Sequence, residues 1–430
     1  MIKKLSIKHL FNRFDYEIVL KETGTTIITG PNGFGKSTIL KIIDSISTSS
    51  INYFFDLQFE VIQICFDNNK TTVIKKDKDK VTIDTIDITP IRRVFTDYSA
   101  YKRRRSYIRR TPNGYMDMNS GTYVDLFELE NGCIHDEQFW NDFIDYPRRT
   151  NEKIKNIEKI RNLLIDIEKN CDSVKLISEQ RLIKRNFIED EIVNIDVVNE
   201  LPNRLKSEIS KVSDEYSKVA NKLDSSYPSR LFATHDGLKD NKEYEKSLSV
   251  INKKFDNLSK YNLVTIERIA NTGYTEEYSK ALKIYFEDFD KKYQVFAGLI
   301  KKLDLFTQII NSRLQFKEII IDRENGFVIR DSENHQNLML KKLSSGEKQE
   351  IVLFYDLIFN ANKESLLLID EPEISLHVSW QKMFMDDLLN VAKETGVQSI
   401  IATHSPQILS KHLDIQIDLG EMYKNGLSNK

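Results

Sequence analysis

A glycine-rich segment near the start of the chain has the residue types and spacing of a phosphate-binding loop. The pattern G-x-x-x-x-G-K-[ST] lets backbone N–H groups at the start of a helix surround nucleotide phosphates. Glycines permit the backbone to wrap an anion where side chains would clash. We expect Lys36 to reach the β- and γ-phosphates and the Ser37 hydroxyl to bind Mg²⁺. The whole segment follows a β-prone run at 25–29 and reads Gly30-Pro31-Asn32-Gly33-Phe34-Gly35-Lys36-Ser37-Thr38.

A pair of carboxylates near the other end of the chain suits the same chemistry. The run 366–369 is apolar throughout, and Asp370 and Glu371 follow it. The first carboxylate after such a buried strand can hold Mg²⁺, and the second can act as a base for an attacking water. Pro372 is equally typical of an ordinary turn at a strand end. Together with the glycine-rich loop, the pair predicts hydrolysis of ATP with Mg²⁺ as cofactor.

Two further segments carry polar residues at the ends of expected elements. Serines and a glycine precede apolar residues at helical spacing, so we expect a helix over 345–360 whose first amides form a second anion site. By itself this segment could be only an N-capped helix with Glu347 in its first turn. His404 follows an apolar run at 399–402, and a histidine there could contact a phosphate or simply cap the strand. The serine-rich segment reads Leu343-Ser344-Ser345-Gly346-Glu347.

The pattern along the chain predicts a nucleotide-binding α/β domain that is split by helices. Residues 1–135 are strand-rich apart from a helix at 36–46, and residues 318–430 alternate strands and helices. Between them, 136–317 shows heptad spacing, typical of a helical insertion. One core strand is expected inside it, at 174–182, ending at Gln180. Interruptions at 227–229 and Gly237 favour a compact hairpin or bundle of helices over one long rod.

Composition excludes several classes of protein. The chain has 430 residues with 63 basic and 65 acidic side chains, so its net charge of −2 gives no general argument for nucleic acid or membrane binding. Three cysteines without metal or redox spacing are typical of a reducing compartment. No apolar run approaches the ~20 residues of a membrane helix, and we expect a cytoplasmic protein with no membrane partner. A basic cluster at 98–110 could face a protein subunit or bind DNA.

These motifs together resemble those of ABC-type ATPases, in the branch that includes SMC and RecF-like proteins. The resemblance implies an ABC-type P-loop fold, with a mixed sheet, an N-terminal antiparallel β subdomain and an α-helical insertion. It assigns Glu371 as the general base, His404 as the switch histidine, and Gln180 to nucleotide and Mg²⁺ binding. It also implies that ATP lies between two subunits, so that the chain forms at least a homodimer or a higher homo-oligomer. The partner's site would then be completed by the signature residues Ser344, Ser345, Gly346 and Glu347.

Finer matches resemble the ABC ATPases of bacterial anti-phage operons. The segments 371–377 and 402–408, which read EPEISLH and ATHSPQI, are similar to those of OLD-family nucleases and of the ATPase subunits of Septu and PARIS systems. His377 lies where that family's D-loop crosses the dimer interface. The OLD family has a nuclease domain after the switch histidine, whereas residues 405–430 are too few for one. Any nuclease is therefore expected as a separate partner protein.

Three functions remain open from the sequence. The leading hypothesis is the sensor or scaffold ATPase of an anti-phage defence system that controls a separate effector. The second is a DNA-repair or chromosome-associated ATPase that clamps DNA. The third is a nucleotide-dependent assembly scaffold with slow turnover.

Overall fold

The computed structural model describes most of the chain in two compact units. One, here called the sheet unit, comprises Met1–Ile195 and Ala361–Lys430, and the other, the helical unit, comprises Asp196–Asn360. Each unit is described by itself. The described residues are 2–21, 24–89, 108–111, 114–117, 122–125, 151–171, 173–179, 181–188, 191–264, 273–360, 365–374, 376–409 and 411–428. Within these residues, no helix is both long and apolar enough to cross a membrane.

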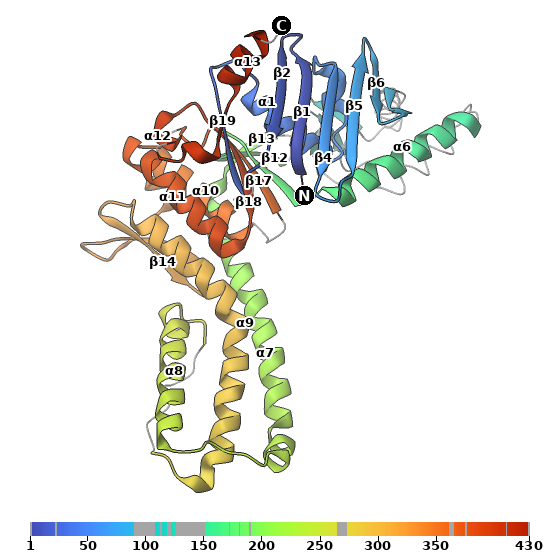
Figure 1. The fold of residues 1–430 in the computed structure, drawn as a ribbon. Helices are drawn as coiled ribbons and strands as arrows, with labels where there is room; N and C mark the ends of the chain where they lie inside the picture. The colour runs from blue at the N-terminus through green and yellow to red at the C-terminus, as the bar shows by residue number, and fades with distance from the viewer. Residues whose placement is uncertain are drawn as a thin grey trace. The chain divides into compact units, whose positions relative to one another are not determined.

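An antiparallel sheet forms the N-terminal part of the sheet unit. Its strand order is β2-β1-β4-β5-β6-β7, and each neighbouring pair is antiparallel (Figure 1). Buried and exposed residues alternate strictly along β2, as expected for a strand with one face on the core. The strands are β1 (Ile2–Leu10), β2 (Phe14–Val19), β4 (Val61–Phe66), β5 (Thr71–Asp77), β6 (Lys80–Ile83) and β7 (Ile86–Asp87).

A parallel sheet carries the segments that the sequence analysis singled out. Its order is β11-β17-β18-β3-β19, with every neighbouring pair parallel. Because the strands are parallel, their carboxyl ends meet at one edge, where ligands of such sheets bind. The register places Asp370 beside Ala402, and Ala402 beside Ile28. The strands are β3 (Thr25–Thr29), β11 (Ser173–Ile177), β17 (Ser365–Asp370), β18 (Gln398–Ala402) and β19 (Gln416–Asp418).

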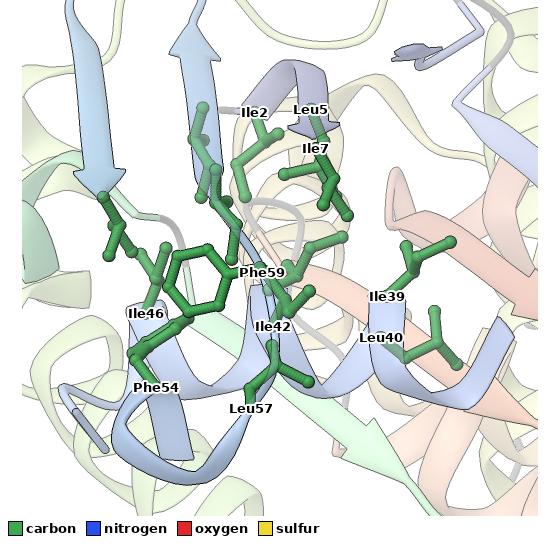
Figure 2. Packing of buried hydrophobic residues seen from close by; sticks show 14 of the residues in the cluster. Ile2, Leu5, Ile7, Ile39, Leu40, Ile42, Ile46, Phe54, Leu57 and Phe59 are labelled. Atoms are coloured by element: carbon green, nitrogen blue, oxygen red, sulfur yellow. The ribbon is translucent and has the colours of Figure 1, made fainter. Parts of the chain in front are cut away.

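Helix α1 (Lys36–Ser47) begins directly after the glycine-rich loop and supplies much of the core. Ile39, Leu40, Ile42 and Ile46 are buried in one apolar cluster with residues of the antiparallel sheet, as Figure 2 shows. A helix that is anchored along this whole apolar stripe holds its first turn at a fixed place. The cluster also includes residues of α2 (Asn52–Asp56) and of α6 (Asn151–Asn170). The C-terminal part of the sheet unit contains three more helices, α11 (Val378–Thr395), α12 (Pro406–Leu409) and α13 (Leu419–Ser428).

Two small sheets complete the sheet unit. The pair β12 (Ile183–Ile188) and β13 (Glu191–Asp196) follows the parallel strand β11. The second small sheet has the order β10-β9-β8. Its strands are β8 (Ile108–Thr111), β9 (Gly114–Asp117) and β10 (Thr122–Asp125).

Long helices dominate the helical unit. Helices α7 (Leu201–Ala233) and α9 (Ser279–Asn311) have 33 residues each and lie side by side (Figure 1). They run antiparallel, since Tyr216 contacts Phe296 while Arg230, further along, pairs with Asp288. Helix α8 (Asn241–Lys260) packs against α9. The unit also contains β14 (Lys317–Asp322), β15 (Gly326–Asp331), β16 (Asn337–Leu338) and α10 (Ser345–Phe359).

The expected interruption of the helices at 227–229 is wrong. Helix α7 continues through Pro228 and ends at Ala233. Proline in a helix removes one amide donor, but Arg230 secures the turn around it. The Arg230 guanidinium donates to both oxygens of Asp288 on α9 and to the carbonyl oxygen of Leu223. Packing against a neighbouring helix therefore outweighs the local cost of the proline.

The two units divide the chain at other positions than those expected from the heptads. The predicted insertion was 136–317, whereas the helical unit spans Asp196–Asn360. Helix α6 lies in the sheet unit because Ile160, Leu164 and Ile167 join the core around α1. The strands β14–β16 and helix α10, expected in the nucleotide-binding domain, belong to the unit of the long helices.

Candidate active site

The glycine-rich loop has the backbone of an anion-binding site. Gly30, Gly33 and Gly35 have φ angles of 148°, 84° and 85°, in the region that favours glycine. A Cβ atom on Gly35 would lie 3.0 Å from Leu10 Cδ2 and 3.3 Å from Phe11 Cε2. Helix α1 begins next, and its N-cap Gly35 offers no side-chain hydrogen bond to the first amides. Those amides lack intrahelical acceptors and are therefore suited to bind a phosphate.

Lys36 is held at the bottom of this loop. Only 5% of the residue is exposed, and its Nζ donates to the carbonyl oxygen of Gly30 at 2.8 Å and more weakly to that of Pro31 at 3.4 Å. Both acceptors are neutral carbonyl oxygens. An anionic phosphate is the ligand that such a buried cation favours. Pro31 and Asn32 are exposed on the loop.

The predicted magnesium ligands come together although they are far apart in sequence. The Ser37 hydroxyl donates to Asp370 Oδ1 at 2.9 Å, across a separation of 333 residues. Burial raises the pKa of Asp370, and the hydrogen bond from Ser37 opposes that shift. A hydroxyl and a carboxylate are hard oxygen donors of the kind that Mg²⁺ prefers. The residues present therefore fit a magnesium ion beside the phosphate loop.

Glu371 and His404 are neighbours at the same edge of the parallel sheet. The amide of Glu371 donates to the carbonyl oxygen of Ala402 at 2.9 Å, which extends the pairing of β17 with β18 by one residue. Glu371 has a φ of 44°, an uncommon conformation for a residue other than glycine. Its Oε1 lies 3.6 Å from His404 Nδ1, and both side chains are partly exposed. A carboxylate and an imidazole thus lie side by side at this edge of the sheet.

The structure adds a residue that the sequence analysis missed. Glu373 Oε1 lies 3.3 Å from His404 Nδ1, closer than Glu371, and the side chain is almost fully buried. The only signal in the sequence is a second carboxylate two positions after Glu371, at a site where a turn would tolerate many polar residues. Its importance depends on contact with residues thirty positions later in the chain.

The remaining loop residues contact aromatic side chains. Phe34 packs on Phe14 with ring centroids 5.0 Å apart and meets Tyr423 of α13 edge-on at 5.9 Å. The Tyr16 hydroxyl donates to the carbonyl oxygen of Phe34 at 2.8 Å. Burial raises the pKa of Tyr53, and the Thr38 side chain opposes that shift. These contacts fix the outer side of the loop and tie it to the C-terminal helix.

The serine-glycine segment begins a helix, as expected, within the helical unit. Ser344 is the N-cap of α10 and forms a capping box with Glu347. Both Glu347 oxygens also accept hydrogen bonds from Lys317 Nζ, at 2.7 and 2.9 Å. Burial opposes ionisation of Glu347, but Lys317 and the Ser344 amide bring its pKa below the ordinary value. The capping box occupies the Ser344 hydroxyl. Ser345 and Gly346 are the first two residues of the helix that it caps.

Three further predicted features have different outcomes. Gln180 lies outside the described residues, and so do positions 98–107 of the basic cluster. His377 is the N-cap of α11, where its Nδ1 accepts from the Ser379 amide at 3.3 Å. This contact accounts for His377 as a capping residue.

Comparison with known proteins identifies a family model and several partial relatives. The model described as "AAA ATPase domain" matches residues 1–409. The probable ATPase of retron Ec83 from Escherichia coli is 30% identical over 145 residues, which cover 31% of this chain and 26% of the relative. The spermidine/putrescine import ATP-binding protein PotA of Mycoplasma mycoides is 31% identical over 93 residues, or 21% of this chain and 26% of PotA. The chain thus spans about a quarter of these two relatives.

Solved structures of SMC head domains also align with the chain. The Thermotoga maritima head has a TM-score of 0.36 and 14% identity, with coverage of 97% of this chain and 94% of the head. The Pyrococcus furiosus Smc head, solved with an extended coiled coil and the C-terminal domain of ScpA, gives a TM-score of 0.35 and 13% identity. That alignment covers 95% of this chain and 91% of the head.

Proposed function

The chain belongs to the AAA ATPase domain family and is an ATPase, and we propose that it works as a homodimer whose two copies complete each other's sites. Within one copy, the α1 amides and Lys36 bind the phosphates of ATP. Ser37 and Asp370 hold Mg²⁺, which neutralises charge on the phosphates. Glu371 accepts the proton of the attacking water, and His404 contacts the γ-phosphate.

The observation that carries this assignment is the hydrogen bond between Ser37 and Asp370. It joins the phosphate loop to the acidic strand end at 2.9 Å, which supports a site that both segments share in one folded unit. Without such contact, each motif alone would be open to an ordinary structural explanation. Ligand binding at the carboxyl edge of a parallel sheet agrees with the position of this pair.

The dimer is supported by the division of the motifs between the two units. The phosphate loop, Asp370, Glu371 and His404 belong to the sheet unit, whereas Ser345 and Gly346 begin a helix in the helical unit. The start of helix α10 provides amides that favour an anion. By resemblance to ABC-type ATPases, these amides face the γ-phosphate that is bound by the partner subunit.

Mixing two inactive variants tests this arrangement. A Ser345→Arg chain keeps its phosphate loop but has a blocked helix start, and a Lys36→Ala chain has the reverse defect. Each alone should be inactive, because every site in its homodimer has one damaged face. In the mixed dimer one site is wholly intact, so ATP turnover should reappear in the mixture.

Two outcomes would contradict the shared site. A Ser345→Arg protein with full activity excludes a role for this helix start. Mixing that restores no turnover, while size analysis confirms mixed dimers, excludes a shared site whose halves act independently. Ser332→Arg, at an exposed turn of the helical unit, is a control for the added charge and should keep full activity.

In the cell, we place this ATPase in the cytoplasm, as the sensor or scaffold of an anti-phage defence system that controls a separate effector such as a nuclease. The support is the resemblance of the segments around Glu371 and His404 to such ATPases, together with the partial match to a retron's probable ATPase. Cells expressing the chain with its neighbouring genes should resist phage, and Glu371→Gln should abolish that resistance. Equal phage plating on wild-type and Glu371→Gln cells would exclude the defence role.

A further inference from the structure

We propose that Glu373 is a positioning residue that holds His404 in its working orientation. This inference rests on the proposed function of His404 at the γ-phosphate and assigns the residue that prepares it. Glu373 belongs to the turn that follows β17, and His404 belongs to the segment that follows β18. The two segments are neighbours because β17 and β18 are paired in parallel.

One oxygen of Glu373 fixes the backbone on both sides of His404. Glu373 Oε1 accepts hydrogen bonds from the Thr403 hydroxyl at 2.7 Å, the His404 amide at 3.0 Å and the Ser405 amide at 3.1 Å. Hydrogen bonds to a charged acceptor are stronger than those between neutral groups. Burial keeps water from competing, since Glu373 is 6% exposed and Thr403 is fully buried. Three donors of the segment that carries His404 thereby meet at one carboxylate oxygen.

The same carboxylate also lies beside the imidazole. Its Oε1 is 3.3 Å from His404 Nδ1, and the Glu371 carboxylate is 3.6 Å from the same nitrogen. The hydrogen bonds of Glu373 go to donors of residues 403–405, so Glu373 places the imidazole beside both carboxylates through the segment that carries it.

A glutamine on α11 reinforces the arrangement. Gln381 Oε1 accepts from the Ser405 hydroxyl at 2.8 Å, and Gln381 Nε2 donates to the carbonyl oxygens of Leu376 at 3.1 Å and Glu373 at 3.5 Å. On the other side, Arg181 donates to the carbonyl oxygen of Pro372 at 3.1 Å. The turn with Glu371 and the segment with His404 thus form one hydrogen-bonded body, whose two reactive side chains keep a fixed spacing.

The second oxygen of Glu373 has no such role. Within the part of the chain that the structure describes, Oε2 is buried without a hydrogen-bond partner. A buried, unsatisfied carboxylate oxygen costs free energy, and such groups are uncommon in folded proteins. The donors of residues 403–405 offset this cost, because an apolar residue at position 373 would leave all three of them without this acceptor.

Kinetics of Glu373→Gln provide the first test. The substitution keeps the size of the side chain and removes its charge, so we expect kcat to fall about 10- to 100-fold with unchanged affinity for ATP. In a His404→Ala background, Glu373→Gln should cause no further loss, because its effect passes through the histidine. Asp386→Asn is the matched control. It alters another carboxylate–histidine pair, Asp386 with His412 at 3.2 Å, and should leave kcat unchanged.

A spectroscopic test needs no ATP hydrolysis and therefore separates this inference from the proposed function. The chain has seven histidines, and His404→Ala identifies the ¹⁵N resonances of His404 in histidine-labelled protein. We expect the resonances of His404 to shift in Glu373→Gln, because the segment that carries the imidazole loses its charged anchor. Thr403→Val, which removes one donor to Glu373 at nearly constant volume, should lower kcat less and shift the same resonances less.

Two results would overturn the proposal. One is a Glu373→Gln protein whose His404 resonances match those of the wild type. The other is a loss of kcat that is equally large with and without His404. If the wild type fails to hydrolyse ATP at all, the proposed function fails, while the resonances of His404 still decide whether Glu373 orients it.

Discussion

At the scale of single residues, we expect Lys36 to act in ATP binding and Glu371 in catalysis, and substitutions should distinguish these two roles. The Lys36 ammonium compensates phosphate charge, so Lys36→Ala should weaken ATP binding about 10- to 100-fold. Glu371→Gln keeps the binding groups and removes the base, so it should retain ATP affinity and lose about 10²- to 10⁴-fold in kcat. Fluorescent-nucleotide titration and single-turnover hydrolysis measure the two effects. Loss of binding in Glu371→Gln, or of catalysis alone in Lys36→Ala, would reverse the assignment.

Sequence reasoning reaches Lys36, Asp370 and His404 because each belongs to a short segment whose residue types fix its own backbone. Glycines at fixed spacing encode a loop, and an apolar run that ends in carboxylates encodes a strand end. Glu373 escapes such reasoning because three of its bonds go to residues 403–405. A local pattern does not record which distant segment it will touch. Contacts of this kind require the sheet register, which appears only in the structure.

At the scale of single elements, the stability of helix α10 should depend on pH through Glu347. Its pKa is lowered in the folded protein, so it contributes stability above its unfolded pKa and loses it as pH falls through the folded pKa. Glu347→Gln should therefore lower the free energy of local unfolding of α10 by about 1 kcal/mol at neutral pH. The 345–359 amides should then exchange their hydrogens faster than in the wild type. As the pH falls below the ordinary glutamate value of 4.5, the variant and the wild type should converge. A difference that persists unchanged in acid would contradict this.

Helix α13 should influence ATP affinity although it lies beyond the residues that the family model matches. Leu419 is fully buried and would contact a Cβ on Gly30 at 3.2 Å, and Tyr423 packs on Phe34 of the phosphate loop. Tyr423→Ala should loosen the loop and weaken ATP binding about tenfold, the effect of losing an aromatic pair. Tyr423→Phe, which removes only the hydroxyl bonded to Arg13, should bind nearly as the wild type does. Equal ATP affinities for all three proteins would exclude such a brace.

Prediction of elements from the sequence was accurate where periodicity and end signals agreed. The parallel strand at 366–370, helix α10 and the strand β11 were all expected from apolar runs and capping residues. Helix α6 was assigned to the insertion because its heptads look like those of α7, yet Ile160 and Leu164 pack in the core of the sheet unit. Periodicity shows that a face is buried without showing which neighbour buries it.

At the scale of the whole molecule, we expect the helical unit to fold independently, because Asp196–Asn360 is one continuous segment. It has its own ion pairs, including the buried pair Arg313–Glu350 at 3.3 Å between the end of α9 and helix α10. A 196–360 fragment should give a helical circular dichroism spectrum and a cooperative melting transition. Glu350→Ala should abolish that transition or lower its midpoint sharply, since removing one partner of a buried pair costs about 3–5 kcal/mol. A fragment without a cooperative transition would show that the unit needs the rest of the chain.

The strand order of the parallel sheet has a consequence during synthesis. Strand β3 pairs with β18 on one side and with β19 on the other, so both neighbours leave the ribosome long after it does. At ~5–20 residues per second, the delay between β3 and β18 is roughly 20–75 s. Throughout that interval the isoleucines of β3 lack their neighbouring strands, while the continuous segment of long helices can already fold. The nascent chain therefore leaves both edges of β3 unpaired until β18 and β19 are made.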